Sequence, residues 1–252
     1  MIRICTVYFE GKYTPDYVER LYNSLKRNCT LPFEFICYSD NPNVKADKVI
    51  PLPNPKYTDI KKHWHKITFF SPMFAGQEPG DDMIIMDIDQ VIVGNVDHII
   101  GRPVGENELL SYKKWWGFTS DWLPLNGGFY KFKSGGKCKN LWDKFRENPE
   151  YWQLKYFKSM VVHYKYFGEQ NFVYNRLKEF DIKLLTVPGQ HVCKITSDKR
   201  QNMEVSLEYM KKYNTDYMIL DKPHPNIRIV HFANPHTTIH ESGFDWIKDY
   251  WK

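Results

Sequence analysis

Two spacings of apolar residues recur along this chain. Short apolar runs between polar or turn residues predict buried strands, and apolar residues three or four positions apart predict one face of a helix. Strands are predicted over Ile2–Phe9, Phe33–Tyr38, Met83–Met86, Leu109–Tyr112, Phe129–Phe132, Lys183–Val187 and Ile227–Phe232. Helices are predicted over Pro15–Lys26, Ile60–Phe70, Gly136–Arg146, Tyr151–Met160, Glu169–Lys178, Met203–Tyr213 and Ser242–Trp251. Because strands and helices alternate early in the chain, the fold class is α/β, with a mostly parallel sheet flanked by helices and right-handed crossovers.

Turn residues separate these segments. Pro51–Pro55 reads as a proline-broken loop, and Asn126-Gly127-Gly128 reads as a turn before the next strand. Residues 188–196 fit neither a strand nor a helix pattern. The stretch Lys113–Leu123 reads as a loop, and it contains three tryptophans that could form a platform for a sugar ring or belong to a lid or the core: Trp115, Trp116 and Trp122.

The segment Met83–Val93 has the most informative pattern, because two carboxylates, Asp87 and Asp89, interrupt an apolar run. Burying a bare carboxylate costs several kcal/mol. The carboxyl end of a central strand avoids that cost, since side chains there emerge into the crevice where α/β sheets bind ligands. Residues two apart on an extended chain point to the same side. The pair can therefore hold one hard divalent cation together with phosphate oxygens; the alternative is that both acids cap a turn or a helix.

Composition narrows the class of ligand. The 252 residues contain no Gly/Ser-rich, Pro-rich or charge-run segment, so residues 1–252 are expected to form one domain. The net charge of +5 fits a polyanionic ligand such as a nucleotide, but the basic residues are too dispersed for nucleic acid.

The five cysteines include no Cys-x-x-Cys pair, and the chain starts without the apolar segment of a signal peptide. No apolar run is long enough to span a membrane, so we expect a cytoplasmic protein.

Several segments in chain order resemble nucleotide-sugar-dependent glycosyltransferases of the A-type fold, in particular small bacterial and viral relatives of the glycogenin-like, family-8 enzymes. The most specific segment is Asp87-Ile88-Asp89-Gln90-Val91-Ile92-Val93-Gly94-Asn95-Val96-Asp97, which is similar to the family's metal-binding segment. The other matching segments are the opening strand and helix with residues 33–40, Trp64-His65-Lys66, Leu125-Asn126-Gly127-Gly128, Glu169-Gln170-Asn171 and Ile229-Val230-His231-Phe232. Two positions depart from the family pattern, since Gly127 replaces a serine and Glu169 replaces an aspartate.

The resemblance implies a single glycosyltransferase domain with a Rossmann-like, mixed and mostly parallel sheet. Residues 1–100 would form the nucleotide-binding part, and residues 101–252 would form the acceptor-binding part. The enzyme would move a sugar from a nucleoside diphosphate sugar, most simply a UDP-sugar, to a saccharide or glycoconjugate. The family retains the anomeric configuration, which favours retention here. The residues leave the donor sugar, the acceptor and the oligomeric state open.

The resemblance also implies a metal site. The ligands would be Asp87, Asp89 and His231, and the cation would act as a Lewis acid on the departing diphosphate. An imidazole with carboxylates leans towards Mn²⁺ over Mg²⁺. Taken alone, His231 would be read as a structural histidine at a strand end. The remaining histidines, His63 among them, show no metal-ligand spacing.

Further site residues follow from the same resemblance. Donor contacts are expected from four residues in the first part of the chain: Tyr8, Asp40, Lys66 and Ile88. Catalytic or acceptor contacts are expected from three residues in the second part: Asn126, Glu169 and Gln170. Each has a plainer alternative, because Asp40 or Asn126 can serve a turn, Lys66 can be a solvated lysine, and Glu169 can favour a helix N-terminus.

Two other classes of protein fit parts of the sequence. Asp87-Ile88-Asp89-Gln90-Val91 also fits the Asp-x-Asp-x-Val start of haloacid-dehalogenase-like phosphatases, in which the first Asp is a nucleophile. Those enzymes resemble one another in placing this segment near the N-terminus, whereas a strand-helix-strand unit and a further helix precede it here. A non-catalytic sugar- or nucleotide-binding module on the same fold is the second alternative.

Overall fold

The structure is a computed structural model. It describes residues 1–11, 13–54, 56, 58–112, 125–158, 168–188, 191–195, 225–232, 238–242 and 244–252. The predicted tryptophan platform (Trp115, Trp116 and Trp122) and the helix predicted over Met203–Tyr213 lie outside these residues.

Seven strands form a central sheet in the order β3-β2-β1-β4-β7-β6-β8. They are β1 (Ile2–Tyr8), β2 (Phe33–Ser39), β3 (Lys48–Pro51), β4 (Asp82–Met86), β6 (Glu108–Tyr112), β7 (Asn126–Lys133) and β8 (Lys183–Val187). Strands β1 to β4 run parallel, and β6 pairs parallel with β8, while β7 is antiparallel to both of its neighbours. The predicted α/β class with a mixed, mostly parallel sheet is confirmed.

A smaller sheet lies beside the central one, in the order β5-β10-β9. Its strands are β5 (Gln90–Ile92), β9 (Val192–Ile195) and β10 (Ile229–Phe232). Strand β10 is antiparallel to β5 and parallel to β9. A late segment of the chain is thereby paired directly with the residues that follow Asp89.

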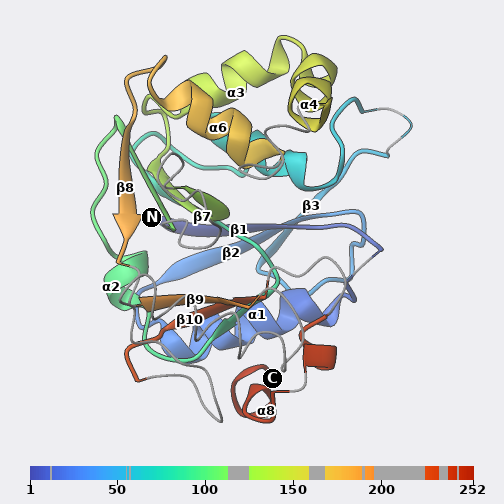
Figure 1. The fold of residues 1–252 in the computed structure, drawn as a ribbon, viewed down its shortest axis with the longest axis vertical. Coiled ribbons are helices and arrows are strands. Elements are labelled where there is room, and N and C mark those ends of the chain that lie inside the picture. Colours follow the sequence, from blue (N-terminus) through green and yellow to red (C-terminus); the bar gives the residue numbers. More distant parts are fainter. Residues whose placement is uncertain are drawn as a thin grey trace.

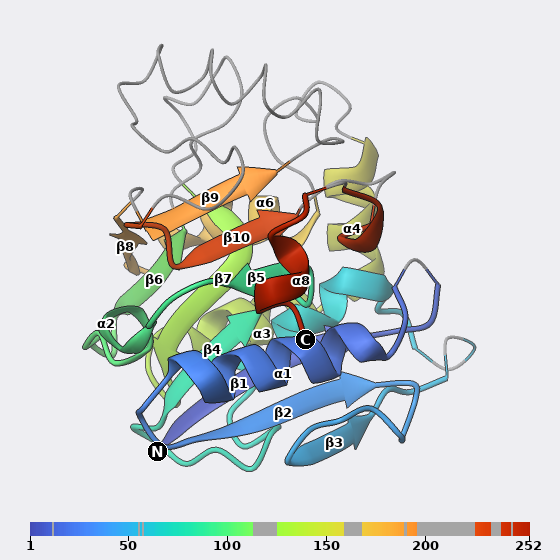
Figure 2. The same ribbon diagram turned by 90° about the horizontal axis from the view of Figure 1, so that it is seen from below.

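Helices cover both faces of the central sheet. They are α1 (Asp16–Asn28), the 3₁₀-helix η2 (Lys62–Phe70), α2 (Asp97–Ile100), α3 (Lys139–Arg146), α4 (Pro149–Lys158), α6 (Glu169–Leu177), the 3₁₀-helix η5 (His240–Ser242) and α8 (Ile247–Tyr250). Helices α3, α4 and α6 lie on one side of the central strands, and α1, α8 and the small sheet lie on the other (Figures 1 and 2). Among the described residues, no helix combines the length and the apolar character needed to cross a membrane.

Strand β4 shows why the sheet has two hydrophobic cores. Ile84 and Met86 belong to the core under α1, whereas Met83 and Ile85 belong to the core under α3 and α6. Successive strand residues point to opposite faces, so a strand covered on both faces needs an unbroken apolar run. Residues Met83–Met86 form such an apolar run. Polar residues can begin only after Met86, where the side chains no longer lie in the two cores.

Three sequence predictions of elements are wrong in detail. Asn126-Gly127-Gly128 is not a turn but the start of β7, and its pairing with β6 is irregular beside Tyr112. The Ile60–Phe70 helix is a 3₁₀-helix that starts at Lys62, whose φ of 51° lies in the left-handed region. The helix predicted over Ser242–Trp251 is confined to Ile247–Tyr250. In each case contacts with neighbouring segments override the backbone conformation that the local sequence pattern predicts.

Strand β3 and helix α2 are among the elements that were not predicted. Strand β3 lies at the edge of the sheet and ends at Pro51, where the sequence predicts the start of a loop. Proline is tolerated there because an edge strand does not need every backbone N–H for pairing. Helix α2 is a single short turn, which is too short to produce a helical pattern in the sequence.

Candidate functional site

The segment Asp87-Ile88-Asp89 joins the two sheets, since β4 ends at Met86 and β5 begins at Gln90. Two backbone hydrogen bonds hold it. The Asp87 N–H donates to the carbonyl of Gly128 in β7 over 3.1 Å, and the carbonyl of Asp89 accepts from the Phe232 N–H in β10 over 2.8 Å. The backbone that carries the two carboxylates is therefore fixed to the central sheet at Asp87 and to the small sheet at Asp89.

The structure brings Asp87, Asp89 and His231 together. His231 Nε2 lies 3.2 Å from Asp89 Oδ1 and 3.8 Å from Asp87 Oδ2. One ligand atom from each residue lies within 4.8 Å of the others, and no other group of three His, Cys, Asp or Glu side chains meets this condition among the described residues. The His231 side chain is 3% exposed and that of Asp87 is 29% exposed. The cluster thus opens to solvent on the side of Asp87.

Charge repulsion and burial dominate the electrostatics of this cluster. Burial raises the pKa of Asp87, Lys66 opposes that rise, and the neighbouring Asp89 carboxylate adds to it. Tyr13 donates a hydrogen bond from its hydroxyl to Asp89 Oδ2 over 2.8 Å, and burial raises the pKa of Tyr13, so the donor keeps its proton. Tyr13 was not predicted as a site residue. Its position just beyond the carboxyl end of β1 was the available signal.

Lys66 lies next to the cluster as a buried cation. Its Nζ donates to Asp87 Oδ1 over 2.8 Å and to the carbonyl of Gly127 over 3.0 Å, and it pairs with Glu169 Oε1 over 2.8 Å. The side chain is 6% exposed, so the reading of Lys66 as a solvated surface lysine is wrong. An ammonium has three N–H donors, and protein acceptors meet all three. A contact from Lys66 to a donor sugar or phosphate would have to replace one of them.

Glu169 lies at the start of α6 and is 5% exposed. Its second oxygen, Oε2, lies 3.5 Å from Nε2 of His63. His63 shows no metal-ligand spacing in the sequence, and no local pattern indicates its contact with α6. The predicted catalytic candidate is therefore held between a lysine and a histidine, both from η2.

The predicted amides Asn126 and Gln170 support the glycines of β7. The Gly128 N–H donates to Asn126 Oδ1 over 3.0 Å, and the Gly127 N–H donates to Gln170 Oε1 over 2.9 Å. A Cβ on Gly128 would lie 2.6 Å from Cε1 of His231, which is closer than real Cβ contacts. Glycine is required at 128 because the imidazole packs against the strand itself.

The remaining predicted donor contacts lie around the loop between β1 and α1. The Tyr8 hydroxyl donates to the carbonyl of Tyr13 over 3.2 Å, and Asp40 accepts a hydrogen bond from the Glu10 N–H over 3.0 Å. Ile88 is 6% exposed and packs into the core beneath the acids. In these contacts Tyr8 and Asp40 shape the loop that carries Tyr13, and their contact with a donor stays a prediction.

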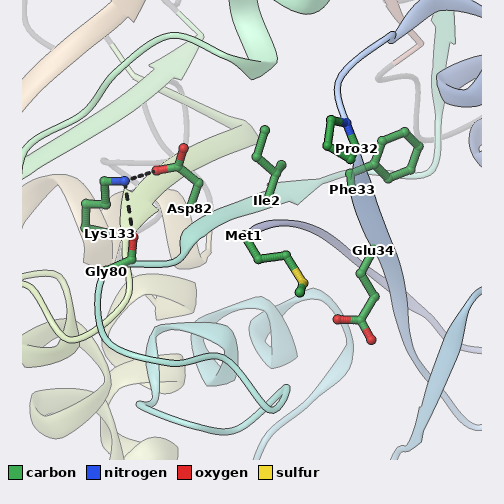
Figure 3. A pocket seen from close by; sticks show the side chains of 8 residues that line it. All are labelled: Met1, Ile2, Pro32, Phe33, Glu34, Gly80, Asp82 and Lys133. Atoms are coloured by element: carbon green, nitrogen blue, oxygen red, sulfur yellow. Dashed lines mark hydrogen bonds and ion pairs between the residues drawn. The ribbon is translucent and has the colours of Figure 1, made fainter.

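A hollow of about 570 Å³ lies at the other end of the strands, away from the acids. It is lined at the amino-terminal ends of β1, β2 and β4, where Lys133 bridges the Asp82 carboxylate and the Gly80 carbonyl (Figure 3). Ligands of open α/β sheets bind at the carboxyl ends of the strands. We therefore place the candidate site at the acids and give this hollow no part in it.

The sheet order, the small sheet carrying His231 and the Asp-x-Asp crossover together form the A-type glycosyltransferase fold. The galactosyltransferase LgtC, in complex with donor and acceptor sugar analogs, is similar over 98% of this chain and 94% of its own, with a TM-score of 0.56 and 10% identity. The glycosyltransferase GlyE of Streptococcus pneumoniae TIGR4 is similar over 92% of this chain and 55% of its own, with a TM-score of 0.57 and 12% identity. The bifunctional glycosyltransferase WbbM is similar over 98% of this chain and 50% of its own, with a TM-score of 0.54 and 11% identity.

At these identities the likeness concerns the fold. No family model matches the chain, and a sequence search of curated proteins finds no significant match.

Proposed function

We propose that this protein transfers a sugar from a nucleoside diphosphate sugar, most simply a UDP-sugar, to a saccharide or glycoconjugate acceptor with the help of a divalent cation. The observation that carries the proposal is the meeting of Asp87, Asp89 and His231 beyond the carboxyl end of β4. LgtC, whose fold this chain shares, is in complex with donor and acceptor sugar analogs. The likeness supports glycosyl transfer, and the cluster supports its dependence on metal.

The three side chains fit a divalent cation. Two ligands bound about 2.1 Å from one ion at right angles lie about 3.0 Å apart. His231 Nε2 lies 3.2 Å from Asp89, which is close to that value, and 3.8 Å from Asp87, which corresponds to a wider angle at the ion. Two carboxylates with one imidazole suit Mn²⁺ better than Mg²⁺. When bound, the cation would neutralise the negative charge on the departing diphosphate.

The protein's own side chains would orient the reactants. The amide oxygens of Asn126 and Gln170 accept hydrogen bonds from backbone N–H groups of β7. Their NH₂ groups would then donate hydrogen bonds to oxygen atoms of a sugar. Lys66 holds the carboxylates of Asp87 and Glu169 in place through its two ion pairs. Glu169 would act on the acceptor side of the site, because it belongs to α6, in the second part of the chain.

Metal-dependent binding of the nucleotide tests the proposal. By calorimetry, UDP should bind far more tightly with Mn²⁺ than with a chelator, since the cation bridges the acids and the diphosphate. Asp89→Asn and His231→Ala should remove most of that difference, whereas Asp59→Asn at an exposed position should not. Equal UDP affinity with and without metal would contradict the proposed site.

Turnover tests the reaction itself. A panel of UDP-sugars should be screened for release of UDP with Mn²⁺, in the presence of monosaccharides and disaccharides as acceptors. Retention, favoured by the family resemblance, would be read from the anomeric proton of the product by NMR. Phosphatase activity on p-nitrophenyl phosphate should be absent, because the matched folds are glycosyltransferases and do not favour the phosphatase alternative. Phosphate release without UDP release would reverse that assignment.

A further inference from the structure

Tyr13 lies in the loop between β1 and α1, and contacts with two other tyrosines hold it there. Its carbonyl accepts a hydrogen bond from the Tyr8 hydroxyl over 3.2 Å, and its ring lies against the ring of Tyr17, with the centroids 4.6 Å apart. Tyr17 is 1% exposed, and its hydroxyl accepts a hydrogen bond from the Ile239 N–H over 2.9 Å. The Tyr13 ring is therefore fixed against the core, and from this position its hydroxyl reaches Asp89.

The two oxygens of each acid in the metal cluster contact different partners. In Asp89, Oδ2 accepts the hydrogen bond from Tyr13 over 2.8 Å, while Oδ1 lies 3.2 Å from His231 Nε2. In Asp87, Oδ1 accepts from Lys66 over 2.8 Å, while Oδ2 lies 3.8 Å from His231 Nε2. Each carboxylate thus has one oxygen bound by a protein donor and turns the other towards the imidazole.

This division of the oxygens limits how the acids can bind a cation. A carboxylate can bind a metal through one oxygen or through both. To use both, Asp89 would have to turn Oδ2 away from the Tyr13 hydroxyl, and Asp87 would have to turn Oδ1 away from the buried Lys66 ammonium. Monodentate binding needs neither movement. The protein would then supply three ligand atoms, and a six-coordinate cation would keep its other positions for diphosphate oxygens and water.

We propose that Tyr13 is a positioning residue that keeps Asp89 a monodentate ligand and thereby makes the site select Mn²⁺ against Ca²⁺; this inference rests on the metal-dependent transfer proposed above. Ca²⁺ takes about 6–8 oxygen ligands and often binds carboxylates through both oxygens. Mn²⁺ accepts octahedral coordination, and an imidazole suits it better than it suits Ca²⁺. Tyr13 acts through Asp89, because a hydrogen bond to a ligating carboxylate fixes its orientation at the metal.

The affinities for the two cations, measured without nucleotide, test this role. Bound Mn²⁺ is read from the loss of the free-ion EPR signal, and bound Ca²⁺ from its competition with Mn²⁺. Tyr13→Phe keeps the ring and removes the hydroxyl, so the affinity for Mn²⁺ should fall about 10-fold or more. The affinity for Ca²⁺ should fall less or rise, because Oδ2 of Asp89 becomes available as a second ligand. Tyr151→Phe, at a 49% exposed position on α4, is the matched control and should keep both wild-type affinities.

A structure of the wild type with Mn²⁺ and UDP tests the same point without a variant. Asp89 should bind the ion through Oδ1 alone, with the Tyr13 hydroxyl still on Oδ2. Binding through both oxygens overturns the inference, and so does a wild type that binds Ca²⁺ as tightly as Mn²⁺. Equal changes in both affinities in Tyr13→Phe, including no change, also overturn it, because Tyr13 would then only support the loop. Each of these results leaves the proposed function standing. A wild type that binds neither cation, with or without UDP, overturns the metal-dependent function and the role of Tyr13 with it.

Discussion

Lys66→Met should destabilise the protein strongly, because it removes the cation between two acids. The Lys66 side chain is 6% exposed, and methionine keeps most of the apolar stem while it removes the charge. Glu169, 5% exposed, loses its only close lysine among the described residues. Removing one partner of a buried pair costs about 3–5 kcal/mol. At about 2–4 °C per kcal/mol for a domain of this size, the melting temperature should fall by about 6–20 °C.

Titration of Lys66 itself should not make this effect depend on pH near neutrality. Burial lowers the pKa of Lys66, but attraction to Asp87 and Glu169 outweighs burial and raises the pKa overall. A lysine whose pKa is raised by folding stabilises the protein fully below its unfolded pKa of about 10.4, and the contribution is lost only as the pH rises through the higher folded value. In urea unfolding between pH 6 and pH 9, any change in the difference between Lys66→Met and the wild type should therefore come from Asp87, whose raised pKa Lys66 opposes, and not from Lys66.

Double substitution separates lost charge from lost packing. Glu169→Gln combined with Lys66→Met should recover part of the stability, since the uncompensated carboxylate is gone. Lys61→Met, at an exposed position just before η2, is the matched control and should change the melting temperature by less than about 2 °C. A melting temperature of Lys66→Met equal to that of the control, or losses that simply add in the double variant, would refute this account of Lys66.

Two further predictions concern η2 and β7. Burial lowers the pKa of His65 to about 4 from 6.5. The buried neutral imidazole therefore contributes its full stabilisation above pH 6.5. This stabilisation is lost as the pH falls towards 4, by up to about 1.4 kcal/mol per pH unit. The unfolding free energy of His65→Phe should therefore fall less steeply in this window than that of the wild type, and parallel curves would contradict it. Gly127→Ser should lower the melting temperature, because a Cβ there would lie 2.5 Å from Glu169 Oε1, and adding the shorter Glu169→Asp should recover part of the loss. Strictly additive effects would show that the two positions are independent.

That coupling offers a physical reason for the two departures from the pattern of the family that this sequence resembles. By that resemblance, Gly127 stands where the family has a serine and Glu169 where it has an aspartate. The longer carboxylate reaches Lys66 across the space that a side chain at 127 would fill, and Tyr130 also lies within 2.8 Å of that space. A shorter acid would leave room for a Cβ. The family resemblance points to both positions but not to the volume that they share.

The sequence alone was sufficient for the α/β class and for the importance of Met83–Val93. Burial on both faces of β4 demands an unbroken apolar run, so two acids directly after it are readable as ligands at the end of a central strand. The place of His231 came from family resemblance. The tertiary structure supplies its physical cause, which is the pairing of β10 with β5 that sets His231 opposite Gln90.

Other features depend on contacts that no local pattern records. Whether Asn126-Gly127-Gly128 is a turn or a strand depends on what packs against it, and here β4, β6, Gln170 and His231 hold it extended. His63 and Lys66 belong to a helix whose spacing shows only an apolar face. Buried segments can be predicted from the sequence because burial follows from short-range pattern. The contacts of Lys66 with Asp87 and Glu169, and of Glu169 with His63, become visible only in the folded chain, because they join segments far apart in the sequence.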